Sequence, residues 1–302
     1  MDILNAEYLR SSVPIKAIRS HLKEIPPGLN ELFEIILARD GKNIEQMHVC
    51  LKWVLCAIRP LKPQELYFAV QLGLDRGSST YWDQEDVELD HMELFVRTST
   101  KGLAEVTRNK AFEVQLIHES VRDFLLGRYG VQWSEPSGNF GGHSHNMLRD
   151  CCLAQLNAPV HQSVDIPDPL PQGTEGAKLR ENLNLKFPLL AYSVLSVLRH
   201  ANDAQHQGMQ QGDFLAAFPF QRWAAISNAF ERHVIRRYRK SVSLLYLLAE
   251  NDLADLIRIY PRVVSCFDVE DERYGPSIFA AIATGSNKAI ESLAEACLIV
   301  EP

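Results

Sequence analysis

Apolar residues recur every three or four positions through much of the first third of the chain, which is the spacing of an amphipathic helix. This spacing predicts one helix after the Pro-Pro-Gly break at 26–28 and a second at 44–58. A third helix is expected to begin at Pro63, where the missing N–H costs nothing, and a fourth to cover 85–100. The apolar faces of the first two helices comprise Leu29, Leu32, Phe33, Ile36, Leu37 and Met47, Leu51, Val54, Leu55, Ile58.

Two short segments then change the apolar period from that of a helix to that of a strand. In "GLAEVT" (102–107) and "AFEVQLIHE" (111–119), apolar and polar residues alternate, and the polar tripeptide "RNK" joins them. Helices followed by a small hairpin indicate a winged helix. We therefore expect a winged-helix domain over 26–130, preceded by a helical arm at 1–25.

Residues 131–240 are expected to form a connector that is rich in loops. Glycine, proline, asparagine and serine are frequent from 131 to 183, where only Ser144–Leu156 shows a helical pattern. Helical spacing returns at Phe187–Ala204 and at Gln221–Tyr238.

Residues 241–302 contain an internal repeat in which an apolar helix, a polar turn and a second apolar helix occur twice. Leu245 and Phe279 are thirty-four residues apart, as are Ala249 and Ala283, which is near the ankyrin period of about 33. Two units bury too little apolar surface to stand alone, so we expect the preceding helices to cap them. The predicted fold is mainly α: a winged helix with a small β-hairpin, a helical connector and two ankyrin-like helix pairs.

Composition narrows the classes of protein. The formal net charge is -7 and 46% of the residues are hydrophobic, so the chain is globular and lacks a bulk positive field for nucleic acid or anionic lipid. The longest uncharged apolar stretch, Phe187–Leu198, is too short to span a bilayer, and a cytoplasmic location is expected. The cysteines lack the CxxC spacing of a zinc or redox site and are expected to be reduced thiols: Cys50, Cys56, Cys151, Cys152, Cys266 and Cys297.

His118, Glu119 and Ser120 together hold the three groups of a hydrolase triad. Neighbouring residues on an extended backbone point to opposite faces, so adjacency argues against convergence. We expect instead that Ser120 caps the helix "VRDFLL", with Asp123 completing an acidic variant of the capping box. His118 is expected to close the wing strand by a hydrogen bond to a neighbouring group.

A lipase-like site would need a GxSxG elbow after a buried strand. The nearest match is centred on Ser144, where asparagine replaces the last glycine and a Gly-rich segment precedes it. We therefore expect Ser144 to cap the helix that follows.

A mixed metal cluster is conceivable from residues of the connector, namely His143, His145, Cys151, Cys152 and His161. Vicinal cysteines on a helix point about 100° apart, which is unsuitable for one tetrahedral ion. We expect one of the two cysteines to be buried and the other partly exposed. The sequence thus identifies no catalytic, cofactor-binding or metal-ligating residue.

A winged helix also suggests DNA binding. The helix before the hairpin would be the recognition element, but it is crowded with acidic residues, and no lysine or arginine occurs between Gly77 and Val96. The wing carries Lys101, Arg108 and Lys110, which is a weak footprint. Nucleic-acid binding is therefore not expected.

The densest basic run is "ERHVIRRYRKS" (231–241). Toward the end of a helix, cations would offset the helix dipole, which is the simpler interpretation. The alternative is an interaction patch for an acidic surface or an anionic headgroup, made of Arg232, Arg236, Arg237, Arg239 and Lys240.

The string from "IPPGLNELFEIILARD" to "VQLIHESVRDFLL" resembles the winged-helix segment of fungal NACHT-type STAND proteins, which include NACHT and ankyrin proteins of the NOD-like receptor class. The same type of winged helix is also named GPI inositol-deacylase-like. "FPLLAYSVLSVLRHA" resembles the helical connector of these proteins, and "SLLYLLAENDLADLI" resembles their first ankyrin unit.

The resemblance implies a non-catalytic regulatory and protein-interaction module, whose partner is a neighbouring NACHT domain or another chain. The phosphate-binding pattern GxxxxGK[ST] of the family's ATPase is missing from these 302 residues. The chain is then either a fragment or split form of a larger receptor, or a remnant that binds without hydrolysing. The alternatives are a lipid hydrolase-related protein and a winged-helix nucleic-acid binder.

Overall fold

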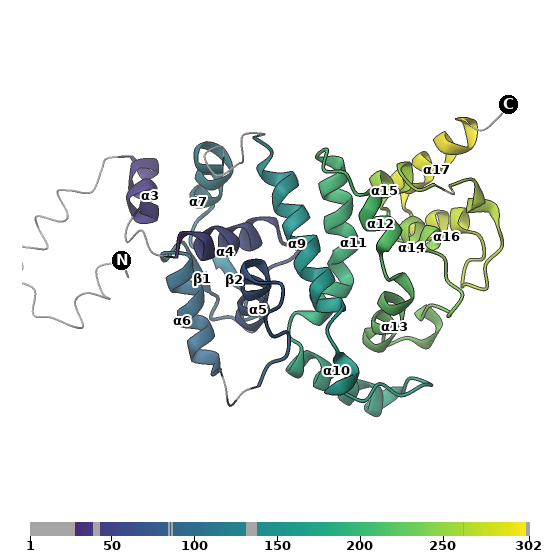
Figure 1. The fold of residues 1–302 in the computed structure, drawn as a ribbon, viewed down its shortest axis with the longest axis horizontal. Coiled ribbons are helices and arrows are strands. Elements are labelled where there is room, and N and C mark those ends of the chain that lie inside the picture. Colours follow the sequence, from purple (N-terminus) through teal and green to yellow (C-terminus); the bar gives the residue numbers. More distant parts are fainter. Residues whose placement is uncertain are drawn as a thin grey trace, which may run out of the picture.

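The computed structural model describes residues 28–38, 43–83, 85, 87–130, 138–261 and 263–299 of the chain. This part of the protein is mainly helical, and its elements follow one long axis from the N-terminal to the C-terminal side (Figure 1). None of the described helices has the length and apolar composition needed to cross a membrane. The arm predicted at 1–25 lies outside the described residues.

The helices and the hairpin predicted for the winged helix are present. They are α3 (Leu29–Ala38), α4 (Ile44–Cys56), α5 (Pro63–Leu74), α6 (Leu89–Ser99), β1 (Ala104–Val106), β2 (Val114–Leu116) and α7 (Glu119–Phe124), which a π-helical turn at Leu125–Tyr129 continues. The two strands pair antiparallel, with Glu105 opposite Gln115, and form the wing. Pro63 is the first residue of α5, as predicted.

The turn between α4 and α5 is fixed by a buried carboxylate. Glu65 accepts a hydrogen bond from the Lys62 backbone N–H at 2.8 Å, and the guanidinium of Arg59 donates to its two oxygens at 2.8 and 2.6 Å. A buried charge is costly unless it is paired and hydrogen-bonded, and both conditions are met for Glu65.

Two groups of buried side chains hold the described elements together. The smaller joins α3, α4 and α7 around the rings of Phe33 and Phe124, whose centroids are 5.3 Å apart. The larger continues without a break from Trp53 in the winged helix through Tyr192 to Leu293 near the C-terminal side. The winged helix, the connector and the helix pairs therefore share one hydrophobic core.

The connector is more regular than the sequence suggested. It contains α9 (Phe140–Leu156), a 3₁₀ turn (Val160–Gln162), α10 (Gly173–Lys186), α11 (Leu190–His206), α12 (Gly212–Ala217) and α13 (Phe220–Phe230). The prediction of loop across α10 was wrong, because this helix is largely exposed: it buries Gly176 and Leu183 and so shows little apolar periodicity. The prediction of a helix up to Tyr238 was also wrong, since α13 ends at Phe230 and a 3₁₀ turn at Val234–Arg236 follows.

The repeat detected in the sequence forms two helical hairpins. They are α14 (Leu244–Glu250) with α15 (Ala254–Arg258), and α16 (Ser277–Thr284) with α17 (Asn287–Ile299). The hairpins stack in parallel, because α14 packs against α16 and α15 packs against α17. On the other side of the stack α11 packs against α15, so a connector helix covers the first hairpin (Figure 1).

The second helix of each hairpin, α15 or α17, is capped by a side chain from the preceding unit. The carboxamide oxygen of Asn202 in α11 accepts hydrogen bonds from the N–H groups of Asp255 and Leu256 at 3.0 and 3.4 Å. The carboxylate of Asp252 accepts one from the N–H of Ala289 at 2.8 Å. Since free N–H groups at a helix start need acceptors, these contacts fix how neighbouring units stack.

Candidate interaction surface

Two successive loops, 231–243 before α14 and 267–276 before α16, form an exposed surface that we call the loop surface. Ile235 and Val269 lie thirty-four residues apart, at equivalent positions of the two loops, and their exposed fractions are 75% and 84%. Arg239 and Arg273 are related in the same way. The repeat therefore presents an exposed apolar residue and a basic residue twice.

The two loops are held in place by hydrogen bonds at the starts of α14 and α16. The carboxylate of Glu270 accepts from the Ser243 N–H at 2.9 Å, the Ser243 hydroxyl at 2.6 Å and the Ser277 hydroxyl at 3.1 Å. It thus ties the start of α14 to the start of α16. The Glu272 carboxylate accepts from the Arg239 N–H at 2.8 Å, which joins the two loops directly.

A shallow cavity of about 300 Å³ lies where the two loops meet, lined by Val234, Ile235, Arg237, Tyr238, Arg239, Glu272 and Arg273. Below it, burial raises the pKa of Glu250, whose carboxylate lies 3.7 Å from the guanidinium of Arg273. Burial and the adjacent Glu250 also raise the pKa of Tyr238, so its hydroxyl stays protonated. The cavity offers an apolar edge, hydrogen-bond donors and cations.

The basic run 231–241 lies within the loop surface, but its cations make different contacts. α13 ends at Phe230, so these cations lie beyond its last turn. Of the helix-end interpretation, the contact of Arg237 to the carbonyl of the C-cap residue Glu231 is present. Arg237 is committed to the fold: its guanidinium donates to the carbonyls of Leu170, Pro171 and Glu231. Lys240 pairs with Asp168 at 2.8 Å on an exposed site. Arg232, Arg236 and Arg239 are exposed and make no ion pair with any described residue.

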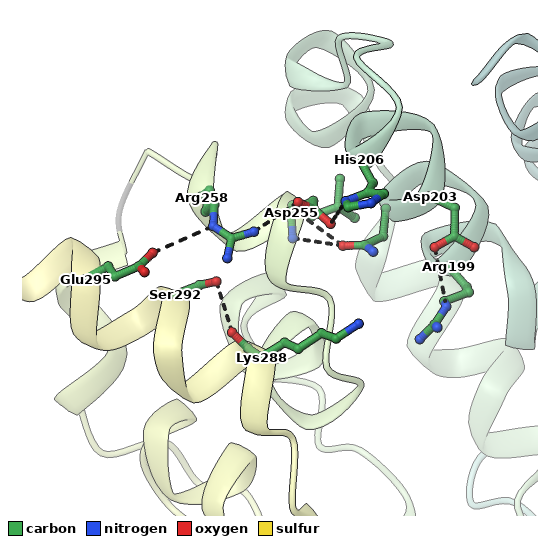
Figure 2. A network of polar contacts seen from close by, with 10 residues as sticks. Arg199, Asp203, His206, Asp255, Arg258, Lys288, Ser292 and Glu295 are labelled. Carbon is green, nitrogen blue, oxygen red and sulfur yellow. Dashed lines mark hydrogen bonds and ion pairs between the residues drawn. The ribbon is translucent and has the colours of Figure 1, made fainter. Parts of the chain in front are cut away.

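Titratable side chains of α11, α15 and α17 contact one another. Figure 2 shows Asp255 of α15 between His206 of α11, at 3.3 Å, and Arg258, at 2.9 Å. Arg258 in turn lies 3.7 Å from Glu295 of α17. Exposed ion pairs of this kind contribute at most about 1 kcal/mol each to the stability of the fold. Each charged side chain in them already has a partner within the chain. Arg232, Arg236 and Arg239 are among the described cations that make no ion pair and so stay available to a partner.

The triad candidates lie at the start of α7, and the cap is not the residue predicted. His118 occupies the N-cap position, and its Nδ1 accepts from the Ser120 N–H at 3.0 Å and lies 2.8 Å from the Ser120 hydroxyl. Ser120 is inside the first turn, so the capping box of Ser120 with exposed Asp123 was wrong. The S-x-x-D pattern could not reveal that an imidazole two residues earlier would take the same N–H.

Glu119 does not complete a triad. It is exposed and lies 3.8 Å from Arg122, and no described carboxylate contacts the imidazole of His118. The expected hydrogen bond of His118 to a neighbouring group is present, but it caps α7 and lies beyond the end of β2 at Leu116. These residues do not line the cavity between the two loops, and the arrangement supports a structural role.

Ser144 and the cysteines of the connector are buried inside the fold. α9 begins at Phe140 with Asn139 as its cap, and the Ser144 hydroxyl donates to the Phe140 carbonyl at 2.7 Å, so the predicted Ser144 cap was wrong. Cys151 and Cys152 are both fully buried, which corrects the expectation that one is partly exposed. Burial raises the pKa of both thiols and keeps them protonated.

The described side chains contain no candidate metal site, because no three His, Cys, Asp or Glu residues among them lie close enough to hold one ion. The side chain of His161 lies outside the described set. His143 belongs to α9, and His145 of the same helix contacts another histidine instead of a thiol.

That second histidine, His200, belongs to a buried polar cluster that no sequence pattern indicated. Its Nδ1 lies 3.0 Å from Nδ1 of His145, and its Nε2 lies 2.8 Å from the hydroxyl of Tyr192. The same hydroxyl accepts from the Ile58 N–H at 3.0 Å, and Trp53 packs edge-on against the Tyr192 ring. We call these residues the buried joint, because they connect the winged helix to α9 and α11.

The comparisons with known proteins concern the first part of the chain. Residues 34–132, about a third of the chain, match the family described as GPI inositol-deacylase, winged helix domain. Neither the curated proteins nor the solved structures yielded a match. The winged helix is thus supported by both the family match and the geometry.

Proposed function

We propose that this chain is a non-catalytic regulatory and protein-interaction module of a cytoplasmic NACHT-ankyrin, STAND receptor-like signalling protein. The observation that carries the proposal is the stack of two helical hairpins whose loops repeat an exposed apolar residue and a cation, Ile235 with Arg239 and Val269 with Arg273. A repeated, pre-formed surface of this kind suits a protein partner. The winged helix would pack against a neighbouring nucleotide-binding domain.

A continuous core supports a regulatory role for such a module. Buried residues extend from the winged helix to α17 without interruption. A partner bound at the loop surface could therefore bias how the winged helix packs, provided that it binds two packing states with different affinities.

The matched family is named after a deacylase, and its winged helix domain is the part that this chain resembles. We assign no hydrolase step to the chain. The His118 and Ser120 pair lacks a carboxylate partner among the described residues, and the Nδ1 that would activate the hydroxyl already accepts a backbone N–H. A competing acceptor role weakens the imidazole as a general base.

Photo-cross-linking tests the proposal. A photoreactive amino acid replaces Ile235 or Val269 in the full chain, expressed in cells that make the protein, and Leu94 on α6, which is 49% exposed, serves as the control position. We expect one protein to cross-link from both loop positions and not from position 94. Equal yields at all three positions would contradict the loop surface as a binding site.

Two further measurements test the rest of the proposal. Co-purification with a NACHT-domain polypeptide, without added ATP, is expected for the winged helix, and its absence would remove the STAND assignment. An ester-hydrolysis assay compares the chain with Ser120→Ala and Ser144→Ala. Hydrolysis that either substitution abolishes would replace the proposal with the hydrolase alternative.

A further inference from the structure

A second surface, separate from the loop cavity, lies where the winged helix meets the connector. It is a groove of about 1020 Å³ bounded by the start of α5, by α10 and by the end of α13, with α11 contributing Ala191, Val194 and Leu195. This groove has room for several side chains, and no part of the proposed function uses it.

Several apolar side chains are exposed in the groove. Leu195 is 75% exposed, whereas the other leucine and valine residues of α11 are buried. Leu185 of α10 is 45% exposed beside it, and Phe230 of α13 lines the same groove. Ala191 and Leu195 are one helical turn apart, so the apolar stripe follows the axis of α11.

The charged residues of the groove leave an excess of cations. Arg59 and Glu65 neutralise each other through two hydrogen bonds. The remaining charged lining residues are three cations, Lys62, Arg180 and Arg232, and two carboxylates, Glu181 and Glu231. None of these three cations forms an ion pair with a described residue, and Glu231 already accepts the His233 N–H. The lining of the groove thus carries one more cation than carboxylates, in a chain whose net charge is -7.

An apolar stripe beside unpaired cations matches one kind of partner. We infer that this groove binds an amphipathic, acidic helix of another protein, with apolar residues at i, i+3, i+4 and i+7 facing Leu195 and carboxylates facing Arg180 and Arg232. Charge complementarity selects this occupant over a basic or neutral helix and steers its approach. Arg232 belongs to both the groove and the loop surface, whereas Leu195 belongs to the groove alone.

Selection from a phage-displayed library of random peptides on the immobilised full chain tests the inference. We expect the enriched peptides to share large apolar residues at helical spacing together with Asp and Glu. Their affinity should fall about tenfold or more for Leu195→Glu, and likewise for Arg180→Glu combined with Arg232→Glu, because central apolar and charged contacts dominate binding. Leu94→Glu, an exposed leucine outside the groove, should leave affinity unchanged.

Other outcomes would overturn the inference. These are no enrichment, enrichment of basic or purely polar peptides, or binding that Leu195→Glu does not weaken. Sedimentation of the chain alone tests a second copy as occupant: a dimer that Leu195→Glu dissociates would replace the proposed partner. Thermal unfolding of each variant confirms that the fold is retained, as expected for substitutions at the exposed positions 195 and 232 and at the half-buried position 180.

Discussion

The buried joint and the loop surface belong to different regions of the molecule and use polar groups in opposite ways. At the joint, the Tyr192 hydroxyl bonds to the Ile58 N–H and to His200, which in turn contacts His145, so folding consumes these groups. On the loop surface, Arg239 has no ion-pair partner among the described residues and Ile235 is uncovered. The polar groups of the joint stabilise the fold, whereas the exposed side chains of the loop surface remain available to bind a partner.

The largest effect is expected at the joint. Trp53→Ala removes a fully buried indole that packs against Tyr192 with ring centroids 5.7 Å apart. The cost should be about 3–5 kcal/mol of unfolding free energy, because lost contacts and a cavity add together. Urea denaturation measures it, with Leu94→Ala as the exposed control. A loss below about 1 kcal/mol would mean that the joint does not hold the winged helix to the connector.

The next effect concerns how the loops are held. Glu270→Ala leaves the Ser243 N–H and two hydroxyls without their shared acceptor, and we expect a loss of about 1.5–3 kcal/mol. Hydrogen exchange should show α14 and α16 opening together. Asp271→Ala, at an exposed neighbouring position, is the control. Unchanged protection of both helices would show that Glu270 is not their link.

The third effect is a dependence of stability on pH that arises at the joint. Burial, with His145 and Arg199 nearby, lowers the pKa of His200 from 6.5 to about 3, and burial also lowers the pKa of His145. As the pH falls, the unfolded chain takes up these protons before the folded chain does. The stability contribution is therefore complete above about pH 6.5 and is lost progressively toward pH 3.

For His200 alone the loss should reach about 2 kcal/mol near pH 5. Urea denaturation at several pH values measures this slope. His200→Gln should flatten it, while His233→Gln, at an exposed position of the loop surface, should not. Equal slopes for the native chain and His200→Gln would contradict a buried neutral imidazole.

Much of the fold could be predicted from the sequence, and the failures have physical causes. The helix-to-strand change of period gave the wing, and the thirty-four-residue spacing gave the stacked hairpins, since both depend on repeated burial. α10 was missed because it buries few residues. The cap of α7 was assigned to Ser120 because local patterns do not show which acceptor, His118 or the hydroxyl, reaches a given N–H.

The candidate surface was predicted in part. The basic run included the exposed cations Arg232, Arg236 and Arg239. Charge alone could not distinguish them from Arg237, whose guanidinium donates hydrogen bonds to two carbonyls of a distant loop. Val269 was missed even though the repeat was found. Applying the repeat spacing to the loops as well as to the helices would have identified it as the equivalent of Ile235.

The smallest effect on stability is the sharpest test of the contrast. Ile235→Asp with Val269→Asp should change the unfolding free energy by no more than about 0.5 kcal/mol, because both side chains already face water. The same double variant should abolish cross-linking of the partner from a photoreactive residue at position 239. Leu245→Asp, at a buried position of α14, should unfold the chain instead, since an unpaired carboxylate cannot be buried there. If the double variant lost stability as Leu245→Asp does, the loop surface would be part of the core and not a site left open for binding.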